Sequence, residues 1–137
     1  MREGEKMRRI LLSINPEYVE RILSGEKRYE YRRKLANDDV EVIIIYATSP
    51  IMKIVGEVKV DGKIAMAPNA LWEKTKKYPG ITRKKYREYF SGCKKAYAYK
   101  LGQVSKYEKA RLLSDIGIVQ APQSFLYLTD DQYKNLV

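Results

Sequence analysis

The segment that most constrains the fold of this chain is residues 40–48, which read VEVIIIYAT. In an extended conformation its apolar, largely β-branched side chains fall on both faces. A short run of this kind is typical of a strand buried at the centre of a sheet. Its unbroken apolar stretch, residues 42–47, is much shorter than the roughly 18–20 residues that a membrane-spanning helix needs. We therefore expect a sheet built around this strand, and no membrane span.

Strand and helix patterns follow one another irregularly along the rest of the chain. Strands are predicted at residues 10–14, 27–33, 54–60, 63–66, 94–104 and 125–128. Helices are predicted at residues 16–24, 68–76 and 82–90, with a helical turn at 112–116 and a short helix after residue 129. Because short turns join most of the strands, the order does not fit a doubly wound fold. We expect an α+β fold, a small mixed or antiparallel β-barrel flanked by short helices.

Local signals predict several helix ends and turns. Asn15 stands before a proline, so its side chain is placed to cap the helix that begins at residue 16. Gly25 is the residue type that ends such a helix. The pair Asp61-Gly62 predicts a hairpin turn between two short strands. Residues 129–132, TDDQ, form a capping box that starts the last helix.

The length of 137 residues is that of one domain, and the chain has no internal repeat, low-complexity tract or linker. We expect a single domain over residues 1–137, with its core at about 9–128. A hydrophobic fraction of 45% is enough for a core at this size, and a charged fraction of 32% favours solubility. The apolar stretch after the charged N-terminal residues is too short for a signal peptide.

The residue types that are absent exclude several kinds of chemistry. The chain has no histidine, and Cys93 is its one cysteine. Serine or cysteine nucleophiles activated by histidine are therefore excluded, and so is a zinc site built from cysteine and histidine. No disulfide can form within the chain, which suits the reducing cytosol. We expect a cytoplasmic protein without a metal or a cofactor, whose chemistry depends on its charged, hydroxyl and phenol side chains.

Positive charge is concentrated in one part of the chain. Lys and Arg number 27 and Asp and Glu 17, which gives a formal net charge of +10. Residues 74–100 contain ten basic residues and one acid, so this segment alone carries +9. Such a surplus favours a polyanionic partner, nucleic acid first, and a solvated face is the alternative. Lys84, Lys85 and Lys94 in this segment are candidate phosphate contacts.

Aromatic residues interrupt the same basic segment. Tyr86, Tyr89 and Phe90 share one face of the helix predicted at residues 82–90. Their helical spacing favours packing against the sheet. The alternative is stacking on unpaired nucleic-acid bases, for which aromatic side chains among basic ones are suited.

The sharpest local pattern is the string GEKRYEYR at residues 25–32. It runs from the end of a helix into a strand that carries Lys27, Glu30 and Arg32 close together. Lys27 can hold a phosphate or carbonyl oxygen, Glu30 can accept from a base N–H, and Arg32 can pair with a phosphate. The structural alternative is a ladder of cross-strand salt bridges on a solvated face.

This string has the form G-x-K-x-x-E-x-R and resembles the signature of ASCH domains, the activating signal cointegrator homology group within the PUA-like superfamily. Residues 10–20 (ILLSINPEYVE) resemble the family's opening strand and helix, and residues 43–58 (IIIYATSPIMKIVGEV) its core hairpin. Residues 121–128 (APQSFLYL) resemble the closing strand of a prokaryotic and phage subgroup described as predicted transcriptional regulators. The resemblance covers most of the chain, from residue 10 to 128.

The resemblance implies a PUA-like β-barrel with flanking helices and a cleft suited to RNA or a nucleotide. It places Lys27, Glu30 and Arg32 at the polar positions of the motif. Further candidate residues of the cleft are Ser13, Asn15, Thr48, Ser49, Gln123 and Ser124. For Asn15 the structural alternative is its helix cap, and for Ser49 it is a turn.

Some ASCH proteins are enzymes, so the resemblance extends to catalysis. One bacterial branch is similar to an amidohydrolase that deacetylates N4-acetylcytidine with a motif Lys, a motif Thr and a downstream Glu. Lys27 matches that Lys, but Glu30 stands at the Thr position and Glu73 is the carboxylate nearest to the downstream one. Other members are linked to RNA cleavage. For that reaction Lys27 and Glu30 are the candidate catalytic pair, with Glu30 taking the 2′-OH proton beside a cationic site.

The sequence leaves three functions open. The first is a nucleic-acid-binding domain with a basic cleft and a regulatory role, for which RNA is favoured over DNA. The second is an enzyme that acts on a modified nucleoside or on RNA, of the amidohydrolase or ribonuclease type. The third is a protein-interaction module with an acidic partner. The motif and the charge distribution favour the first, and the sequence does not predict the oligomeric state.

Overall fold

The computed structural model describes residues 8–36 and 39–137. Its strands are β1 (Arg9–Ile14), β2 (Tyr29–Arg32), β3 (Val42–Ala47), β4 (Lys53–Met66), β5 (Ala96–Arg111) and β6 (Phe125–Leu128). Its helices are α1 (Pro16–Ser24), α2 (Pro68–Thr75), α3 (Arg83–Tyr89) and α4 (Asp130–Lys134), with a 3₁₀ helix at Leu113–Ile116. Across the described ranges, no helix has the length and apolar character that a membrane crossing requires.

The strands form one mixed sheet in the order β2-β5-β4-β3-β1-β6. β3 lies inside it, parallel to β1 and antiparallel to β4, and every residue of β3 is buried. This is the central strand that the apolar pattern of residues 40–48 predicts. The sheet curls into a half-barrel whose edges are β2 and β6. The predicted fold class, α+β with a barrel-like sheet and short helices, is confirmed.

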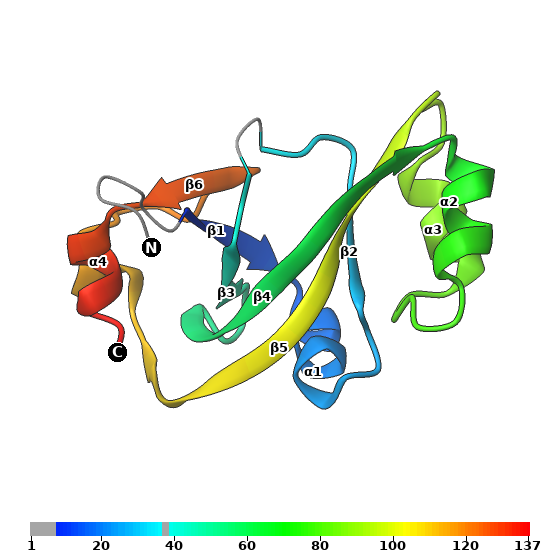
Figure 1. The fold of residues 1–137 in the computed structure, drawn as a ribbon. Helices are drawn as coiled ribbons and strands as arrows, with labels where there is room; N and C mark the ends of the chain where they lie inside the picture. The colour runs from blue at the N-terminus through cyan, green and yellow to red at the C-terminus, as the bar shows by residue number, and fades with distance from the viewer. Residues whose placement is uncertain (1–7, 37–38) are drawn as a thin grey trace.

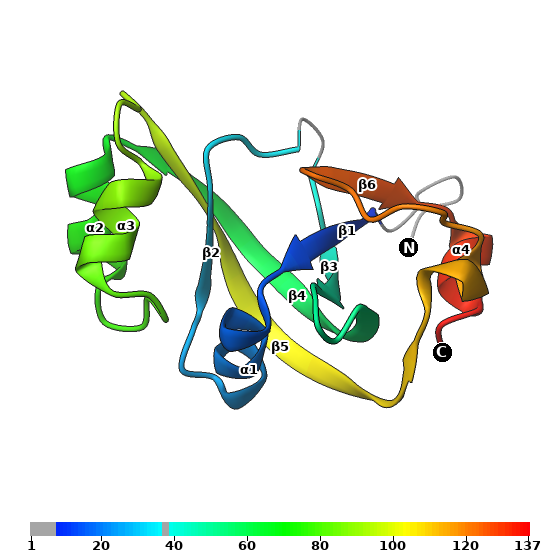
Figure 2. The same cartoon turned by 180° about the vertical axis from the view of Figure 1, so that it is seen from behind.

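β4 and β5 form a long twisted ribbon that crosses the whole molecule, with α2 and α3 at one end and α4 at the other (Figures 1 and 2). The hairpin predicted at Asp61-Gly62 is wrong, because β4 continues through these residues. Gly62 does not adopt the positive φ that an Asp-Gly turn uses. Instead, the pairing with β5 shifts register between Val60 and Gly62. Such a bulge bends a strand without ending it. β5 also continues past its predicted end at residue 104, because Ser105, Lys106 and Arg111 pair with the first part of β4.

The aromatic residues of the basic segment pack inward. Tyr86 of α3 and Phe90, the residue after that helix, are buried with Leu71 of α2 and Tyr31 of β2. The rings of Tyr86 and Tyr31 meet edge to face, with centroids 5.0 Å apart. The packing interpretation of the helical spacing is therefore confirmed for these two aromatic residues. This cluster fixes α3 beside β2.

α1 leaves the end of β1 directly and ends at Gly25, whose φ of 84° is the left-handed conformation that glycine adopts readily. The predicted cap of α1 by the Asn15 side chain is wrong. The Asn15 carboxamide oxygen instead accepts a hydrogen bond from Thr48 Oγ1 at 3.3 Å, because the parallel pairing of β1 and β3 brings the two strand ends together. The capping box predicted at Thr129 is confirmed by its hydrogen bonds with Gln132. The turn that residues 37–39 predict lies mostly outside the described residues.

Candidate functional site

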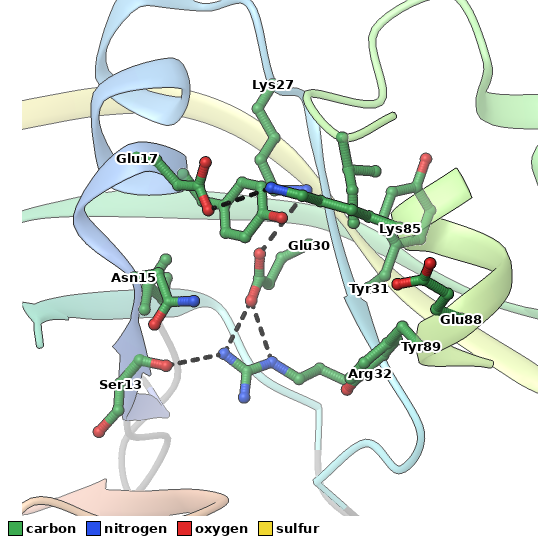
Figure 3. A pocket seen from close by; sticks show the side chains of 13 residues that line it. Ser13, Asn15, Glu17, Lys27, Glu30, Tyr31, Arg32, Lys85, Glu88 and Tyr89 are labelled. Atoms are coloured by element: carbon green, nitrogen blue, oxygen red, sulfur yellow. Dashed lines mark hydrogen bonds and ion pairs between the residues drawn. The ribbon is translucent and has the colours of Figure 1, made fainter. Parts of the chain in front are cut away.

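A pocket of about 600 Å³ opens where the end of β1, the start of α1, β2 and α3 meet (Figure 3). Its walls combine polar and aromatic side chains. The aromatic and aliphatic surface comes chiefly from Tyr18, Tyr31, Ile81 and Tyr89. Because β2 lies at one edge of the curled sheet and β1 near the other, the pocket fills the open side of the half-barrel.

Glu30 and Arg32 lie at the centre of this pocket. Arg32 donates two hydrogen bonds to Glu30 Oε2, from Nε at 3.0 Å and from Nη2 at 2.7 Å. Its Nη2 also donates to the backbone carbonyl of Ser13 at 3.1 Å (Figure 3). The alternation of β2 turns both charged side chains toward the pocket, as the sequence predicts. Arg32 thus joins β2 to β1 across the open side of the sheet.

Lys27 is a buried lysine whose exposed fraction is only 3%. Its Nζ donates a hydrogen bond to the Pro79 carbonyl at 3.0 Å and lies 3.9 Å from Glu30 Oε1. Burial lowers the pKa of Lys27 from 10.5 to about 8. The negative charge of Glu30 opposes this lowering, whereas the positive charges of Arg32 and Arg21 add to it. A part of the Lys27 side chains therefore loses its proton just above neutral pH.

The loop at residues 79–81 closes one side of the pocket over Lys27. Gly80 has a φ of 64°, and a Cβ at this position would overlap the aliphatic stem of Lys27. Only glycine therefore fits here without displacing the loop or the lysine. Arg21 of α1 donates a hydrogen bond from Nη1 to the Gly80 carbonyl at 2.9 Å, which fixes the loop to the helix.

Lys85 and Glu17 face each other across the pocket mouth, from α3 and α1 (Figure 3). Lys85 Nζ lies 3.7 Å from Glu17 Oε1, and both side chains are about half exposed. Glu88, one turn further along α3, also lines the pocket. The cations of the lining are Lys27, Arg32 and Lys85, and its carboxylates are Glu17, Glu30 and Glu88. The pocket is therefore balanced in charge, and the positive surplus lies outside it.

The structure brings one part of the predicted site together. The predicted residues that line the pocket are Ser13, Asn15, Lys27, Glu30, Arg32 and Lys85. Thr48 lies beside it through the hydrogen bond to Asn15. Ser49, Lys84, Lys94, Gln123 and Ser124 are exposed and do not line it. The segment that carries Gln123 still approaches the pocket, because Ser13 Oγ donates to the Pro122 carbonyl at 2.9 Å.

Sequence reasoning missed lining residues on two helices. Glu17 and Tyr18 stand two and three residues after Asn15, so their position at the start of the helix that follows the first strand could have indicated them. Glu88 is the single acid in the basic segment 74–100, and it was missed; Tyr89, for which the sequence leaves packing and base stacking open, lines the pocket beside it. The isolated acid within a basic helix is the one sequence signal that marks Glu88.

The arrangement offers a hydrogen-bond acceptor and a donor side by side. Glu30 Oε2 accepts both bonds from Arg32, while Oε1 faces Lys27 at a distance too long for a hydrogen bond. The pocket can therefore bind a ligand that has both donors and acceptors, and it can move a proton between a carboxylate and an amine. The part of the chain that the structure describes holds no group of three or more cysteine or carboxylate ligands for a metal ion.

The sequence matches the family model described as ASCH domain over residues 12–111. A relative from Zymomonas mobilis, named ASCH domain-containing ribonuclease, is 30% identical over 131 residues, which cover 93% of this chain and 88% of that protein. Two relatives from Ureaplasma parvum are matched only in part. The chain spans 15% of the length of one named ATP synthase subunit alpha, at 32% identity, and 41% of one named large ribosomal subunit protein uL22, at 28% identity.

Solved structures agree with the family match. The crystal structure of ASCH from Zymomonas mobilis superimposes with a TM-score of 0.88 at 29% identity and covers 93% of this chain and 92% of that one. The N-terminal domain of Staphylothermus marinus McrB, with a TM-score of 0.59 at 11% identity, shares the fold alone. None of these names describes a transcriptional regulator, so the matches support the family and not the narrower subgroup. The chain belongs to the ASCH domain family.

Proposed function

We propose that this chain binds RNA, with one unstacked nucleotide in the pocket and the flanking phosphates on basic side chains beside it. The observation that carries the proposal is that the buried Lys27 and Glu30 and the half-buried Arg32 lie together in an open pocket. Burying charged groups costs free energy that a purely structural cluster recovers by complete pairing. Here the Lys27 ammonium and Glu30 Oε1 face each other without a hydrogen bond, which is typical of a site prepared for a ligand.

The balanced charge of the pocket suits a nucleoside better than a bare phosphate. Glu30 Oε1 can accept from a base N–H, and the Asn15 amide can both donate and accept. Tyr18 and Tyr89 supply aromatic surface on which a base can pack. The volume of about 600 Å³ is within the range of small-ligand pockets.

Exposed basic side chains at the pocket mouth and outside it supply the phosphate contacts in this proposal. Lys85 of α3 lines the pocket at its mouth, whereas Lys84, on the same helix, and Lys94, which follows that helix, lie outside the pocket; all three are exposed. The expected basic cleft thus becomes a basic rim around a neutral pocket. RNA is favoured over DNA because single-stranded RNA presents unpaired bases, and because the Zymomonas relative is named a ribonuclease.

Fluorescence anisotropy with a labelled single-stranded oligouridylate tests RNA binding. We expect binding that weakens steeply between about 50 and 200 mM salt, and weaker binding of the deoxy oligonucleotide of the same sequence. Lys27→Met should weaken RNA binding at every salt concentration. No measurable RNA binding at the lowest salt concentration would overturn the proposal.

RNA cleavage in the same pocket is a second candidate function. Two observations favour it: the pKa of Lys27 is lowered to about 8, and the Zymomonas relative is named a ribonuclease. Enzymes commonly use a pKa near the working pH for proton transfer. Glu30 Oε1, which accepts no hydrogen bond among the described residues, is the matching base.

The reaction would be an internal transesterification. Glu30 takes the proton of a ribose 2′-OH, the 2′ oxygen forms a bond to phosphorus, and the bond from phosphorus to the 5′ oxygen breaks. Lys27 gives its proton to the leaving 5′ oxygen, and Arg32 stabilises the negative charge of the five-coordinate phosphorus. The products are a 2′,3′-cyclic phosphate and a 5′-hydroxyl. Appearance of these termini, and their loss in Glu30→Gln, tests this candidate; intact RNA in the presence of active binding would contradict it.

The amidohydrolase expectation receives less support from the geometry. Glu73, the carboxylate nearest to the downstream position of that branch, is exposed, pairs with Lys76 at 2.7 Å and does not line the pocket. Incubation with N4-acetylcytidine separates this reaction from RNA cleavage. We expect no deacetylation that depends on Lys27.

We expect a regulatory role, if the chain has one, to act through the same RNA binding. The proposed location is the cytoplasm, whose reducing conditions keep Cys93 a thiol.

The remaining alternative is a protein-interaction module, in which the exposed lysines contact an acidic protein surface. In that case poly-glutamate would displace RNA at equal charge concentration, and substitution of Arg32 would leave both affinities unchanged. If unlabelled RNA displaces the labelled RNA and poly-glutamate does not, the result supports the nucleic-acid proposal.

A further inference from the structure

A second pocket, of about 500 Å³ and more open, lies on the far side of the loop that covers Lys27. It is lined by α1 and by residues 77–82, the connection between α2 and α3. Ile81 lines both pockets. Gly80 lines the second pocket while it packs on the stem of Lys27, which lines the first. The two pockets are therefore neighbours separated by one wall of the chain.

The second pocket combines positive charge with an aromatic surface. Arg21 and Lys77 contribute two cations, and Glu26, whose Oε2 lies 3.4 Å from Arg21 Nε, contributes one carboxylate. Tyr78 forms part of its wall, and the Arg28 guanidinium lies over that ring at 4.1 Å from its centre. An aromatic ring beside a net positive charge is the chemistry that binds a base together with its phosphate.

The contacts that shape the first pocket also hold the second one in place. Arg21 donates to the Gly80 carbonyl at 2.9 Å, and the Arg28 backbone N–H donates to the Tyr78 carbonyl at 2.9 Å. Tyr18 and Arg21, one turn apart on α1, line the first and the second pocket respectively. The same helix and the same loop therefore present both pockets as one preformed surface.

From this juxtaposition we infer that the second pocket binds the nucleotide next to the one in the first pocket, with its base against Tyr78 and its phosphate near Lys77 and Arg21. The inference rests on the proposed RNA binding, because it extends the path of the same RNA chain over Ile81. The substrate class that follows is single-stranded RNA of at least two nucleotides, and not a free mononucleotide.

Competition against a labelled oligouridylate tests whether the second pocket binds a nucleotide. The competitors are uridine 5′-monophosphate and the dinucleotide pUpU, and the quantity of interest is the ratio of their affinities. In the unaltered chain we expect pUpU to bind at least about fivefold more tightly than the mononucleotide, as stacking of one base predicts. Tyr78→Leu and Lys77→Ala should each reduce that ratio toward one. Lys76→Ala, which removes the same charge one residue earlier and outside both pockets, should leave the ratio unchanged.

Each outcome decides between the inferences. If pUpU binds no better than the mononucleotide, or if Lys76→Ala lowers the ratio as much as Lys77→Ala does, the second subsite is overturned while RNA binding in the first pocket stands. If neither competitor nor the oligouridylate binds, the proposed function and this inference fail together. Circular dichroism of Tyr78→Leu and Lys77→Ala confirms that the variants are folded before their ratios are compared.

Discussion

Lys27 Nζ and Glu30 Oε1 face each other at 3.9 Å, as an ion pair without a hydrogen bond. Each partner is held by another group: Lys27 by the Pro79 carbonyl at 3.0 Å, and Glu30 by the two donors of Arg32. The wall of the pocket therefore positions the lysine, and the neighbouring arginine positions the carboxylate. The facing atoms keep hydrogen-bonding capacity for a ligand, and this relationship underlies the predictions below.

The first prediction concerns stability and pH. The pKa of Lys27 is about 8 in the folded chain and about 10.4 in an unfolded one, so between these values the unfolded chain binds more protons. The free energy of unfolding contributed by Lys27 must then rise with pH over this window. We expect the stability of the unaltered chain relative to Lys27→Met to increase by about 2–3 kcal/mol from pH 7 to pH 10. Urea unfolding of both proteins across this range measures the difference.

Tyrosines set the upper limit of that window. Burial raises the pKa of Tyr86 to about 12, and it also raises the pKa of Tyr31. In the unfolded chain these phenols ionise near pH 10, so above that pH they lower the stability of both proteins alike. The comparison between the two proteins removes this common effect. A difference that stays constant from pH 7 to pH 10 would contradict the buried, weakly basic Lys27.

The second prediction concerns Gly80. Gly80→Ala introduces a Cβ at a positive φ and against the stem of Lys27, whereas Gly92→Ala introduces one at a positive φ into open space. Gly92→Ala, the control, should lower the free energy of unfolding by about 1 kcal/mol, the usual cost of an alanine in the left-handed conformation. Gly80→Ala should cost about 2–4 kcal/mol and weaken RNA binding as well. Equal losses in thermal unfolding would show that the contact with Lys27 has no energetic consequence.

The third prediction concerns the ion pair at the pocket mouth. Lys85 and Glu17 are both about half exposed, so breaking their pair should change the free energy of unfolding by less than about 0.5 kcal/mol. Binding should respond in opposite directions: Lys85→Gln should weaken RNA binding, and Glu17→Gln should strengthen it, by about two- to fivefold each. Anisotropy titrations at low salt measure both. Weakening by both variants would instead indicate that the pair itself shapes the pocket.

The fourth prediction concerns binding and pH. Loss of the Lys27 proton removes a positive charge from the site, so RNA affinity should fall as pH rises through about 8, by up to about tenfold between pH 7.5 and 9. An oligocytidylate is the suitable probe, because its bases do not titrate in this range. Lys27→Met should bind weakly and show no such dependence. A pH-independent affinity of the unaltered chain would place the RNA away from Lys27.

The sequence predicts the fold best where apolar pattern and turn chemistry agree. Residues 40–48 predict the central strand, and the last strand, Phe125–Leu128, has its predicted bounds. Asp61-Gly62 misleads because the same pair of residues fits either a hairpin turn or a bulge within a strand. Which of the two forms depends on the pairing with β5, a strand that begins only at Ala96. Asn15 misleads because a neighbouring strand end offers Thr48 to its side chain. Both errors arise where tertiary pairing competes with a local signal.

The candidate site also has a part that the local sequence predicts and a part that depends on tertiary packing. Strand alternation is sufficient to group Glu30 with Arg32, two residues apart on β2. The wall over Lys27 could not be predicted, because Pro79 lies 52 residues away and comes near only through the packing of α2 and α3 against β2. Pro79-Gly80 has the sequence of a simple connector, and its positive φ against a lysine stem becomes visible only in three dimensions.

RNA binding in this pocket is tested most directly by comparing two arginines, one inside the pocket and one outside it. Arg32 lines the pocket, whereas Arg87 lies on α3 outside it. Each is changed to Gln, with Arg32→Lys as a variant that keeps the charge, and the affinity for a labelled oligouridylate is measured at low and moderate salt after folding is confirmed. We expect Arg32→Gln to weaken binding at least about tenfold, Arg32→Lys to weaken it less, and Arg87→Gln to weaken it no more than about twofold. Equal losses from Arg32→Gln and Arg87→Gln would show that RNA responds to net charge alone, and would contradict a binding site in this pocket.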